Sequence, residues 1–452
     1  MQKLKLFLLL SAVFGAVQST VGPLYLTPYI NSGQAALGKS LSTVISADLL
    51  LLGVKSYSGY FTVNSTYNSN LFFWYFPAKN NAANAPVVLW LQGGPGGSSL
   101  YGLFMENGPV FVNQYGRLEK RKVSWHEDHH MVYIDNPVGA GFSFTENANG
   151  YAKNQNDIAT NLFSAVRQFF QVFPEIKNNR FYITGESYAG KYLPTLGYAI
   201  YEKRTSADPW DRINLQGIAI GNGVTDPVHQ ILFGDYFYQL GYIDKNDLAT
   251  FNLYQNAALA HIAQKNFTGA MLYTFALVNS KNCLFNQITG FTSPYNSLKP
   301  DGYNDLVDRV SSFLVNSSIS SVLHVGSRKF VHFIDTNLVL QYLTGDILDS
   351  VAYKLEVLAD YYKIFIYNGI LDLLVSTTLS ANYLSYLQYS GAAELEAAKQ
   401  NIWRFNNEIA GYWKKGGNLY HITVRNAGHM VPVDQPEWAY NLLKRLTYRT
   451  YF

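Results

Sequence analysis

Gly185-Glu186-Ser187-Tyr188-Ala189-Gly190 is the stretch of sequence that decides the fold. It follows a β-type run at 180–184 and precedes residues 191–196, which can open a helix. A serine at the apex of a tight turn between a strand and a helix is a nucleophile elbow. The turn is strained, so the residues two before and two after the serine must be small, as the glycine and alanine here are. The stretch therefore predicts a nucleophilic Ser187 at the end of a sheet strand.

A serine nucleophile needs a general base, and the base needs an orienting group. In hydrolases with this elbow the chain order is Ser, then Asp or Glu, then His, each placed beyond the carboxyl end of a strand. Asp372 follows a β-like run at 363–367, and His429 follows an alternating run at 419–424. Order and placement agree, so the sequence predicts a triad of Ser187, Asp372 and His429.

A glycine-rich loop supplies the next part of an acyl-transfer site. The apolar run 86–91 leads into Gln92-Gly93-Gly94-Pro95-Gly96-Gly97, and glycines after a core strand let backbone N–H groups approach a ligand closely. No G-K-[ST] follows, which disfavours a phosphate-binding loop. We expect the N–H groups of Gly94 and Tyr188 to form the oxyanion hole.

Motifs spread along the chain resemble those of the serine carboxypeptidases, which are acid-acting peptidases with an α/β-hydrolase fold. They are WLQGGPGGSS (90–99), ENGP (106–109), DNPVGAGFS (135–143), GESYAGKY (185–192), GNG (221–223) and GHMVP (428–432). The resemblance runs from about residue 57 to the C-terminus, with a weak middle at 226–349. Gln92 and Gly97 replace the Asn and Cys of the family motif, as in its vitellogenic-like branch.

The resemblance implies a site for the C-terminal carboxylate of the substrate, formed by Gln92, Gly93, Glu106 and Glu186. Two carboxylates that meet in one site cannot both ionise cheaply, so one pKa rises and a proton is shared. A protonated Glu can donate a hydrogen bond to the substrate carboxylate, which an ionised Glu cannot do. The arrangement therefore favours substrates with a free C-terminus and activity at acidic pH.

The run His126-Glu127-Asp128-His129-His130 matches H-E-x-x-H, the signature of zinc peptidases. That motif works on a helix, where residues four apart share one face. Here it leads directly into residues 131–135, which predict a strand, and an extended chain holds the first and last histidines too far apart to share an ion. We interpret the run as a polar connection and expect neither a metal nor an organic cofactor.

Composition indicates a large enzyme of the secretory pathway. The chain has 452 residues, 48% of them hydrophobic, and a net charge of +3 without a basic run, which argues against a nucleic-acid partner. Residues 1–19 predict a signal peptide, and no other stretch is apolar enough to span a bilayer. A secreted or lysosomal protein would use the sequons at Asn64, Asn266 and Asn316.

The succession of strands and helices predicts an α/β fold with a mainly parallel central sheet flanked by helices. We expect the α/β-hydrolase core to comprise residues 20–225 and 350–452, with a mostly helical cap region inserted at 226–349. Cys283 is the only cysteine, which excludes an intrachain disulfide, so the insert is expected to be held by packing alone.

The sequence and the resemblance together predict a serine-type carboxypeptidase that releases C-terminal residues from peptides and proteins through an acyl-enzyme. An acyltransferase on the same scaffold, in which an alcohol replaces water, is an alternative that the shape of an acceptor pocket would decide. A yolk-type or other binding protein with a vestigial site is a second alternative, and the intact triad argues against it. The sequence does not predict an oligomeric state.

Overall fold

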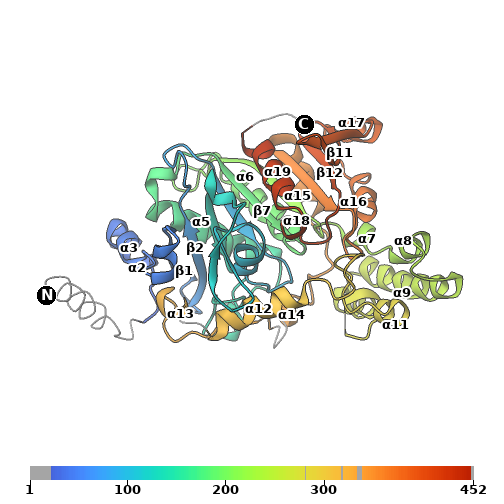
Figure 1. Ribbon diagram of the computed structural model, residues 1–452, viewed down its shortest axis with the longest axis horizontal. Coiled ribbons are helices and arrows are strands. Elements are labelled where there is room, and N and C mark those ends of the chain that lie inside the picture. Colours follow the sequence, from blue (N-terminus) through green and yellow to red (C-terminus); the bar gives the residue numbers. More distant parts are fainter. Residues whose placement is uncertain (1–21, 280, 317–318, 333–337, 449–452) are drawn as a thin grey trace.

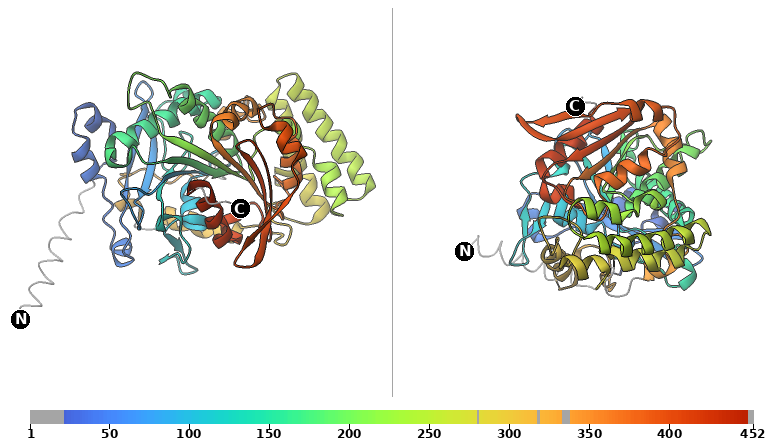
Figure 2. Two further views of the ribbon diagram at one scale, coloured as in Figure 1. Left: turned by 90° about the horizontal axis from the view of Figure 1, so that it is seen from above. Right: turned by 90° about the vertical axis from the view of Figure 1, so that its right-hand side faces the viewer.

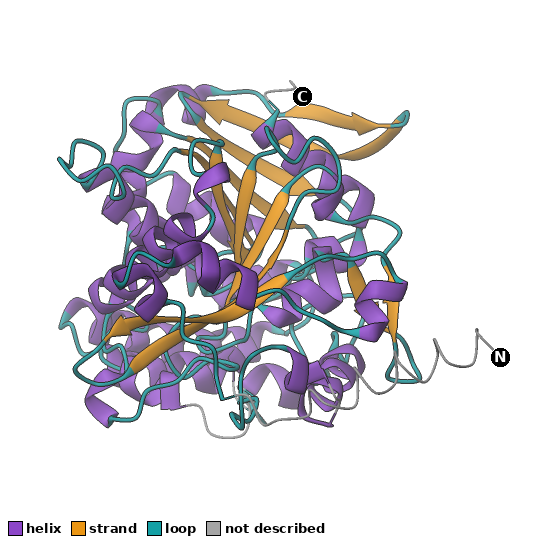
Figure 3. Cartoon of the chain, turned by 90° about the vertical axis from the view of Figure 1, so that its left-hand side faces the viewer, coloured by secondary structure: helices purple, strands orange, loops and turns teal. Residues whose placement is uncertain are grey.

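The computed structural model describes residues 22–279, 281–316, 319–332 and 338–448, so the predicted signal peptide at 1–19 lies outside the described residues. A ten-stranded twisted sheet forms the centre and has helices on both faces (Figures 1 and 3). In spatial order its strands are β1 (Tyr57–Asn64), β2 (Ser69–Phe76), β6 (His130–Ile134), β3 (Val87–Leu91), β7 (Phe181–Glu186), β8 (Leu215–Gly221), β9 (Lys363–Gly369), β12 (Leu419–Val424), β11 (Glu408–Gly416) and β10 (Asn401–Phe405).

The six strands from β6 to β12 run parallel, whereas the two strands at each edge pair antiparallel. Strands buried on both faces need apolar side chains at every position. In β3, Val87 and Leu89 pack into the core on one face of the sheet, and Val88 and Trp90 pack into the core on the other. The mainly parallel sheet predicted from the sequence is confirmed, and it places the carboxyl ends of these strands along one edge.

Helices cover both faces of the sheet. One face packs against α5 (Gln155–Val172), α6 (Ala189–Glu202) and α15 (Ala352–Tyr361), and the other against α19 (Pro436–Thr447). Helix α5 buries its apolar residues, among them Ile158, Leu162 and Phe169, and ends at Val172, shortly before Pro174. Other helices of the core are α2 (Thr27–Asn31), α3 (Ala35–Leu41), α4 (Ala47–Leu51), α16 (Thr377–Leu384), α17 (Ala392–Ala397) and α18 (Val431–Asp434). Within the described residues, no helix combines the length and apolar character that crossing a bilayer requires.

Residues 226–349 are mainly helical and fall into two groups. The first lies beside the sheet end that carries β12 (Figure 2) and comprises α7 (Pro227–Gln230), α8 (Phe233–Gln239), α9 (Lys245–Ala263), α10 (Phe267–Thr274), the π-helix η5 (Phe275–Asn279) and α11 (Leu284–Thr289). The second runs along the core (Figure 1) and comprises α12 (Asn304–Asn316), α13 (Ile319–Val322) and α14 (Leu338–Leu343). The domain boundaries themselves stay predictions.

The insert is not held by packing alone, contrary to the sequence-based expectation. Its first group has an apolar core of its own, which includes Phe237, Phe251 and the buried Cys283. Its end is also joined to α6 by a buried ion pair, in which Lys191 Nζ lies 3.1 Å from Asp346 Oδ2. Sequence reasoning missed this pair because the two residues are 155 positions apart.

Candidate active site

Ser187 occupies the turn between β7 and α6, as predicted. Its φ of 61° lies in the left-handed region, which a non-glycine residue adopts only when its surroundings enforce it. Backbone hydrogen bonds supply that enforcement: Ser187 N donates to Gly221 O at 3.0 Å, and Val224 N donates to Ser187 O at 3.0 Å. A Cβ on Gly185 would lie 2.2 Å from Leu91 O, so this position of the turn admits only glycine.

Asp372 and His429 meet beyond the carboxyl ends of β9 and β12. His429 Nδ1 lies 2.8 Å from Asp372 Oδ2, and both side chains are buried. Asp372 also accepts from Asn222 Nδ2 at 2.7 Å and from Leu374 N at 2.8 Å. These bonds fix the carboxylate, which binds the imidazole through Nδ1 and so leaves Nε2 as the nitrogen that can act on the nucleophile. Asn222 belongs to the GNG motif, but its hydrogen bond to Asp372 was not predicted from the sequence.

Tyr295, from the linker between α11 and α12, packs directly on His429. Their rings are stacked with centroids 4.6 Å apart and planes 9° apart, and His429 N donates to Tyr295 O at 2.8 Å. Sequence reasoning missed this residue because it lies in the weakly matched segment and carries no recognisable motif. The imidazole is therefore held by Asp372 at one nitrogen and by Tyr295 against its flat face.

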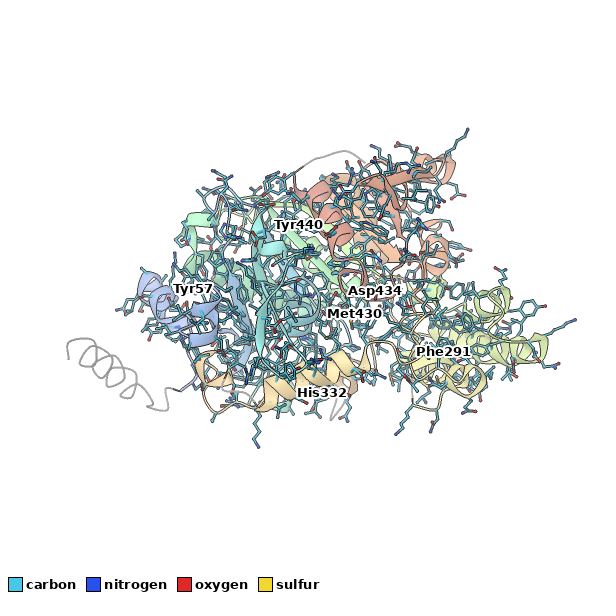
Figure 4. The ribbon with its side chains drawn as sticks, in the orientation of Figure 1. Tyr57, Phe291, His332, Met430, Asp434 and Tyr440 are labelled. Carbon is cyan, nitrogen blue, oxygen red and sulfur yellow. The ribbon has the colours of Figure 1, made fainter. Side chains whose placement is uncertain are left out.

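Asp434 connects the loop of His429 to the same linker. Its carboxylate accepts from Gly428 N at 2.8 Å, Asn296 Nδ2 at 3.0 Å, Tyr303 OH at 2.5 Å and Lys299 Nζ at 2.5 Å. Figure 4 labels Asp434 and Met430 on the side of the core that faces the helical group carrying Phe291. Asp434 thus holds the residue before the histidine and the linker that covers the ring.

We expect Asp434→Ala to lower kcat by roughly tenfold to a hundredfold while KM changes little, because a shifted imidazole impairs proton transfer rather than substrate binding. Steady-state kinetics on one peptide measures both constants. The exposed Glu437 lies three residues further on, so Glu437→Ala is the matched control and should retain the wild-type kcat. A rise in KM at unchanged kcat would contradict this role.

The glycine-rich loop after β3 lies against the nucleophile. A Cβ on Gly93 would lie 2.6 Å from both Ser187 Cβ and Tyr188 N, so only a glycine backbone fits there. Among the described residues, no backbone hydrogen bond engages the N–H of Gly94 or of Tyr188. Tyr188 also precedes the first residue of α6, where the helix dipole favours negative charge. A lack of backbone partners is the property that donors of an oxyanion hole require.

Gln92, Glu106 and Glu186 form a buried polar cluster next to this loop. Gln92 Nε2 donates to Glu186 Oε1 at 2.7 Å, and Trp90 Nε1 donates to Gln92 Oε1 at 2.9 Å. Each glutamate is only 1% exposed. Among the described residues no hydrogen bond of ordinary geometry reaches the Glu106 oxygens, but the side chains of Glu186 and Gln92 lie close enough to act on its pKa. Gln92 is one methylene longer than Asn and still reaches this cluster.

Both glutamates have a raised pKa. Burial is the main cause for each, because it disfavours the charged form. For Glu186 the negative charge of Glu106 adds to the rise. Two ionised carboxylates at this position would repel each other in a region of low dielectric, so the pair keeps a proton at pH values at which a solvated glutamate has lost its own. That proton can be donated to an anionic ligand.

The H-E-x-x-H run is not a helical metal motif in the structure. His126 and Glu127 belong to a short 3-10 helix, η2 (Trp125–Glu127), whereas His130 begins β6. Both ring nitrogens of His130 have partners, the hydroxyl of Tyr75 at 2.7 Å and the carbonyl of Ala82 at 2.7 Å. The described residues contain no group of three or more metal-type ligands. The strand predicted directly after this run is confirmed, because β6 begins at His130.

The three sequons differ in accessibility. Asn64 ends β1 and is partly buried, and its Oδ1 accepts from Thr66 N at 3.1 Å. Asn266 is exposed and caps α10 by accepting from Gly269 N at 3.0 Å. The side chain of Asn316 lies outside the described residues. Glycosylation at these positions stays a prediction.

The chain is similar to known proteins in both sequence and fold. The sequence model of a family described as serine carboxypeptidase matches residues 49–449. The chain is 41% identical to the vitellogenic carboxypeptidase of Aedes aegypti over 95% of this chain and 90% of that protein. It is also 41% identical to the probable serine carboxypeptidase CPVL of Homo sapiens over 94% of this chain and 90% of that protein.

Among solved structures, a prohormone-processing carboxypeptidase of Saccharomyces cerevisiae, Kex1, is similar in fold. It has a TM-score of 0.74 and covers 91% of this chain and 95% of its own, at 23% sequence identity. The predicted fold class and the resemblance stated from the motifs are confirmed.

Proposed function

The chain belongs to the serine carboxypeptidase family and is a serine-type carboxypeptidase, and we propose that Ser187, His429 and Asp372 carry out its chemistry. The observation that supports this most strongly is the buried Asp372–His429 hydrogen bond at 2.8 Å, at the same sheet edge as the strained Ser187 turn. Nucleophile, base and orienting group come from the loops after β7, β12 and β9, in the chain order expected for this fold.

The proposed reaction proceeds through an acyl-enzyme. Ser187 Oγ attacks the carbonyl carbon of the last peptide bond while His429 Nε2 takes the hydroxyl proton. The N–H groups of Gly94 and Tyr188 donate to the negative oxygen that forms. His429 then protonates the leaving amino group, and the C–N bond breaks. Water, activated by the same imidazole, hydrolyses the acyl ester and releases the shortened peptide.

The substrate's C-terminal carboxylate is proposed to bind at Gln92, Gly93, Glu106 and Glu186. Support comes from the two glutamates, which are both buried and both have a raised pKa, and of which Glu186 directly precedes Ser187. A cluster that keeps a proton can bind an anion without repelling it. Peptides and proteins with a free C-terminus are therefore the proposed substrates.

We expect the wild-type enzyme to cleave a peptide with a free C-terminus best at acidic pH, and to lose this activity only above the range in which an ordinary glutamate titrates, because the glutamate pair, whose pKa burial raises, must hold its proton to bind a carboxylate. The same peptide with an amidated C-terminus should depend less on pH. The measurement is kcat/KM against pH for both forms of one peptide. Identical pH profiles for acid and amide would refute carboxylate recognition and leave a serine hydrolase of another specificity.

An acidic compartment fits this pH preference. We propose that the protein enters the secretory pathway through residues 1–19 and is secreted or held in a lysosome-like vesicle. One similar protein is named a venom serine carboxypeptidase of Apis mellifera, at 42% identity over 95% of this chain.

A further inference from the structure

Glu106 lies on a short π-helix, η1 (Gly102–Asn107), whose geometry is unusual. Its turn closes through a hydrogen bond from Gly108 N to Leu103 O at 3.1 Å, five residues apart. A Cβ on Gly108 would lie 2.4 Å from Leu103 O, so only glycine closes the turn in this way. Such π-type turns are rare and less stable than α-helix, and the last carbonyls of any helix need donors from outside it.

Arg121 supplies those donors. Its Nη2 donates to Phe104 O at 2.6 Å, Nη1 to Met105 O at 3.3 Å and Nε to Gly108 O at 3.0 Å. The carbonyls it holds lie on both sides of Glu106 in the chain. A guanidinium presents its N–H groups as a planar, rigid fork, so three simultaneous bonds define one position of the turn. The point charge of a lysine cannot reproduce that geometry.

The chain delivers Arg121 to this position through a small hairpin. Strands β4 (Val110–Val112) and β5 (Leu118–Lys120) pair antiparallel, and Arg121 N donates to Pro109 O at 2.9 Å. Just beyond it, Ser124 Oγ donates to Asn107 O at 3.3 Å. The hairpin therefore begins directly after η1 and returns to cap it. The guanidinium also lies over the ring of Phe111 in β4, 5.8 Å from its centroid.

Charge adds a second link between Arg121 and Glu106. Burial is the main influence on the pKa of Glu106 and favours its protonated form. Contacts with Glu186 and Gln92, and the charges of His429 and Arg121, favour the ionised form of Glu106. For Glu186, burial, Glu106 and the charge of Asp372 all favour the protonated form, against the hydrogen bond from Gln92. Two phenols, those of Tyr133 and Tyr367, also face the pair. Both stay neutral because burial raises their pKa. Removing the cation should therefore shift the titration of the pair to higher pH.

We propose that Arg121 is the positioning residue of the carboxylate site: its fork holds the turn that carries Glu106 and so determines how tightly a free C-terminus binds. The proposal rests on the proposed function of Glu106 and goes beyond it, because Arg121 itself does not touch the substrate. Arg121 was not among the residues predicted from the sequence, since a lone Arg after a charged run carries no motif.

The test compares Arg121→Met and Arg121→Lys with Lys122→Met, which removes the same charge from the exposed next residue. For Arg121→Met we expect KM for the free-acid peptide to rise on the order of a hundredfold, because a displacement of about 1 Å suffices for a loss of that size. The amide of the same peptide should keep its kcat and KM. Arg121→Lys should also raise KM for the free-acid peptide. It keeps the positive charge, so the pH midpoint of the glutamate pair should stay at the wild-type value. Arg121→Met removes the charge and should shift that midpoint upward. Lys122→Met should behave as wild type.

An equal loss on acid and amide would overturn the proposal, because Arg121 would then serve only the fold. An unchanged KM for the acid in either variant would overturn it as well. If thermal unfolding shows that Arg121→Met is not folded, Arg121→Lys decides by its KM alone. Failure of the proposed function is distinguishable, because it would appear in the wild type as identical acid and amide profiles.

Discussion

Ser187→Ala and His429→Ala are each expected to lower kcat on the order of 10⁵-fold to 10⁶-fold, with little change in KM, because both groups act mainly in the transition state. Asp372→Ala should lose somewhat less, about 10⁴-fold, since an imidazole without its orienting carboxylate is still held by Tyr295. Combining two of these substitutions should cost little more than one, because the three residues act as a unit. The measurement is kcat for one amidated peptide, which does not depend on the carboxylate site.

Labelling separates the three variants further. A fluorophosphonate should label Ser187 rapidly in the wild type and slowly in the His429→Ala variant. It should not label the Ser187→Ala variant. Asp360 is exposed, and its carboxylate accepts from Ser390 N, so Asp360→Ala is a control that should keep wild-type activity. Near-normal kcat in Asp372→Ala would show that another acid orients the base. Full activity in Ser187→Ala would refute the serine mechanism altogether.

The parts of the site that follow strands were predictable from the sequence. The β7–Ser187–α6 turn has a local signature, and the apolar runs that become β9 and β12 place Asp372 and His429 at one edge of a parallel sheet. Such strands are buried on both faces, so each appears in the sequence as a short apolar run that ends in turn residues. The hydrogen bond between Asp372 and His429 then follows from the order of the strands, in which β9 and β12 are neighbours.

The supporting contacts were not predictable, for a physical reason. Asn296 and Asp434 are 138 residues apart, and Lys191 and Asp346 are 155 apart. A single Asp, Lys or Tyr within a helical segment has no periodicity that indicates its partner. The described residues of the segment 226–349 form no strand that would fix its place in the sheet, so its two-group arrangement and the position of Tyr295 emerge only from tertiary packing.

Glu186→Gln is expected to remove most of the acid preference of the enzyme. In the wild type, kcat/KM for a free-acid peptide should fall about tenfold per pH unit above the midpoint of the glutamate pair, because the shared proton is lost. A Gln amide can still accept from Gln92 Nε2 and can donate to the substrate carboxylate, and it does not titrate. The variant should therefore keep peptidase activity toward neutral pH, and Glu106→Gln should act in the same direction.

Glu186→Ala is the control that separates the loss of titration from the loss of the donor. It removes both, so it should bind the free-acid peptide poorly at every pH, whereas the amide should be cleaved as by the wild type. Because the two carboxyls titrate as a pair, the wild-type midpoint belongs to both residues, and each Gln variant leaves one buried glutamate whose pKa burial still raises. The remaining acid then titrates without a second carboxyl beside it, while the Gln amide supplies a donor at every pH, so the profile should flatten rather than only shift. If both Gln variants retain the steep wild-type decline, the proton that matters is not on this pair, and the proposed role of the two glutamates is refuted.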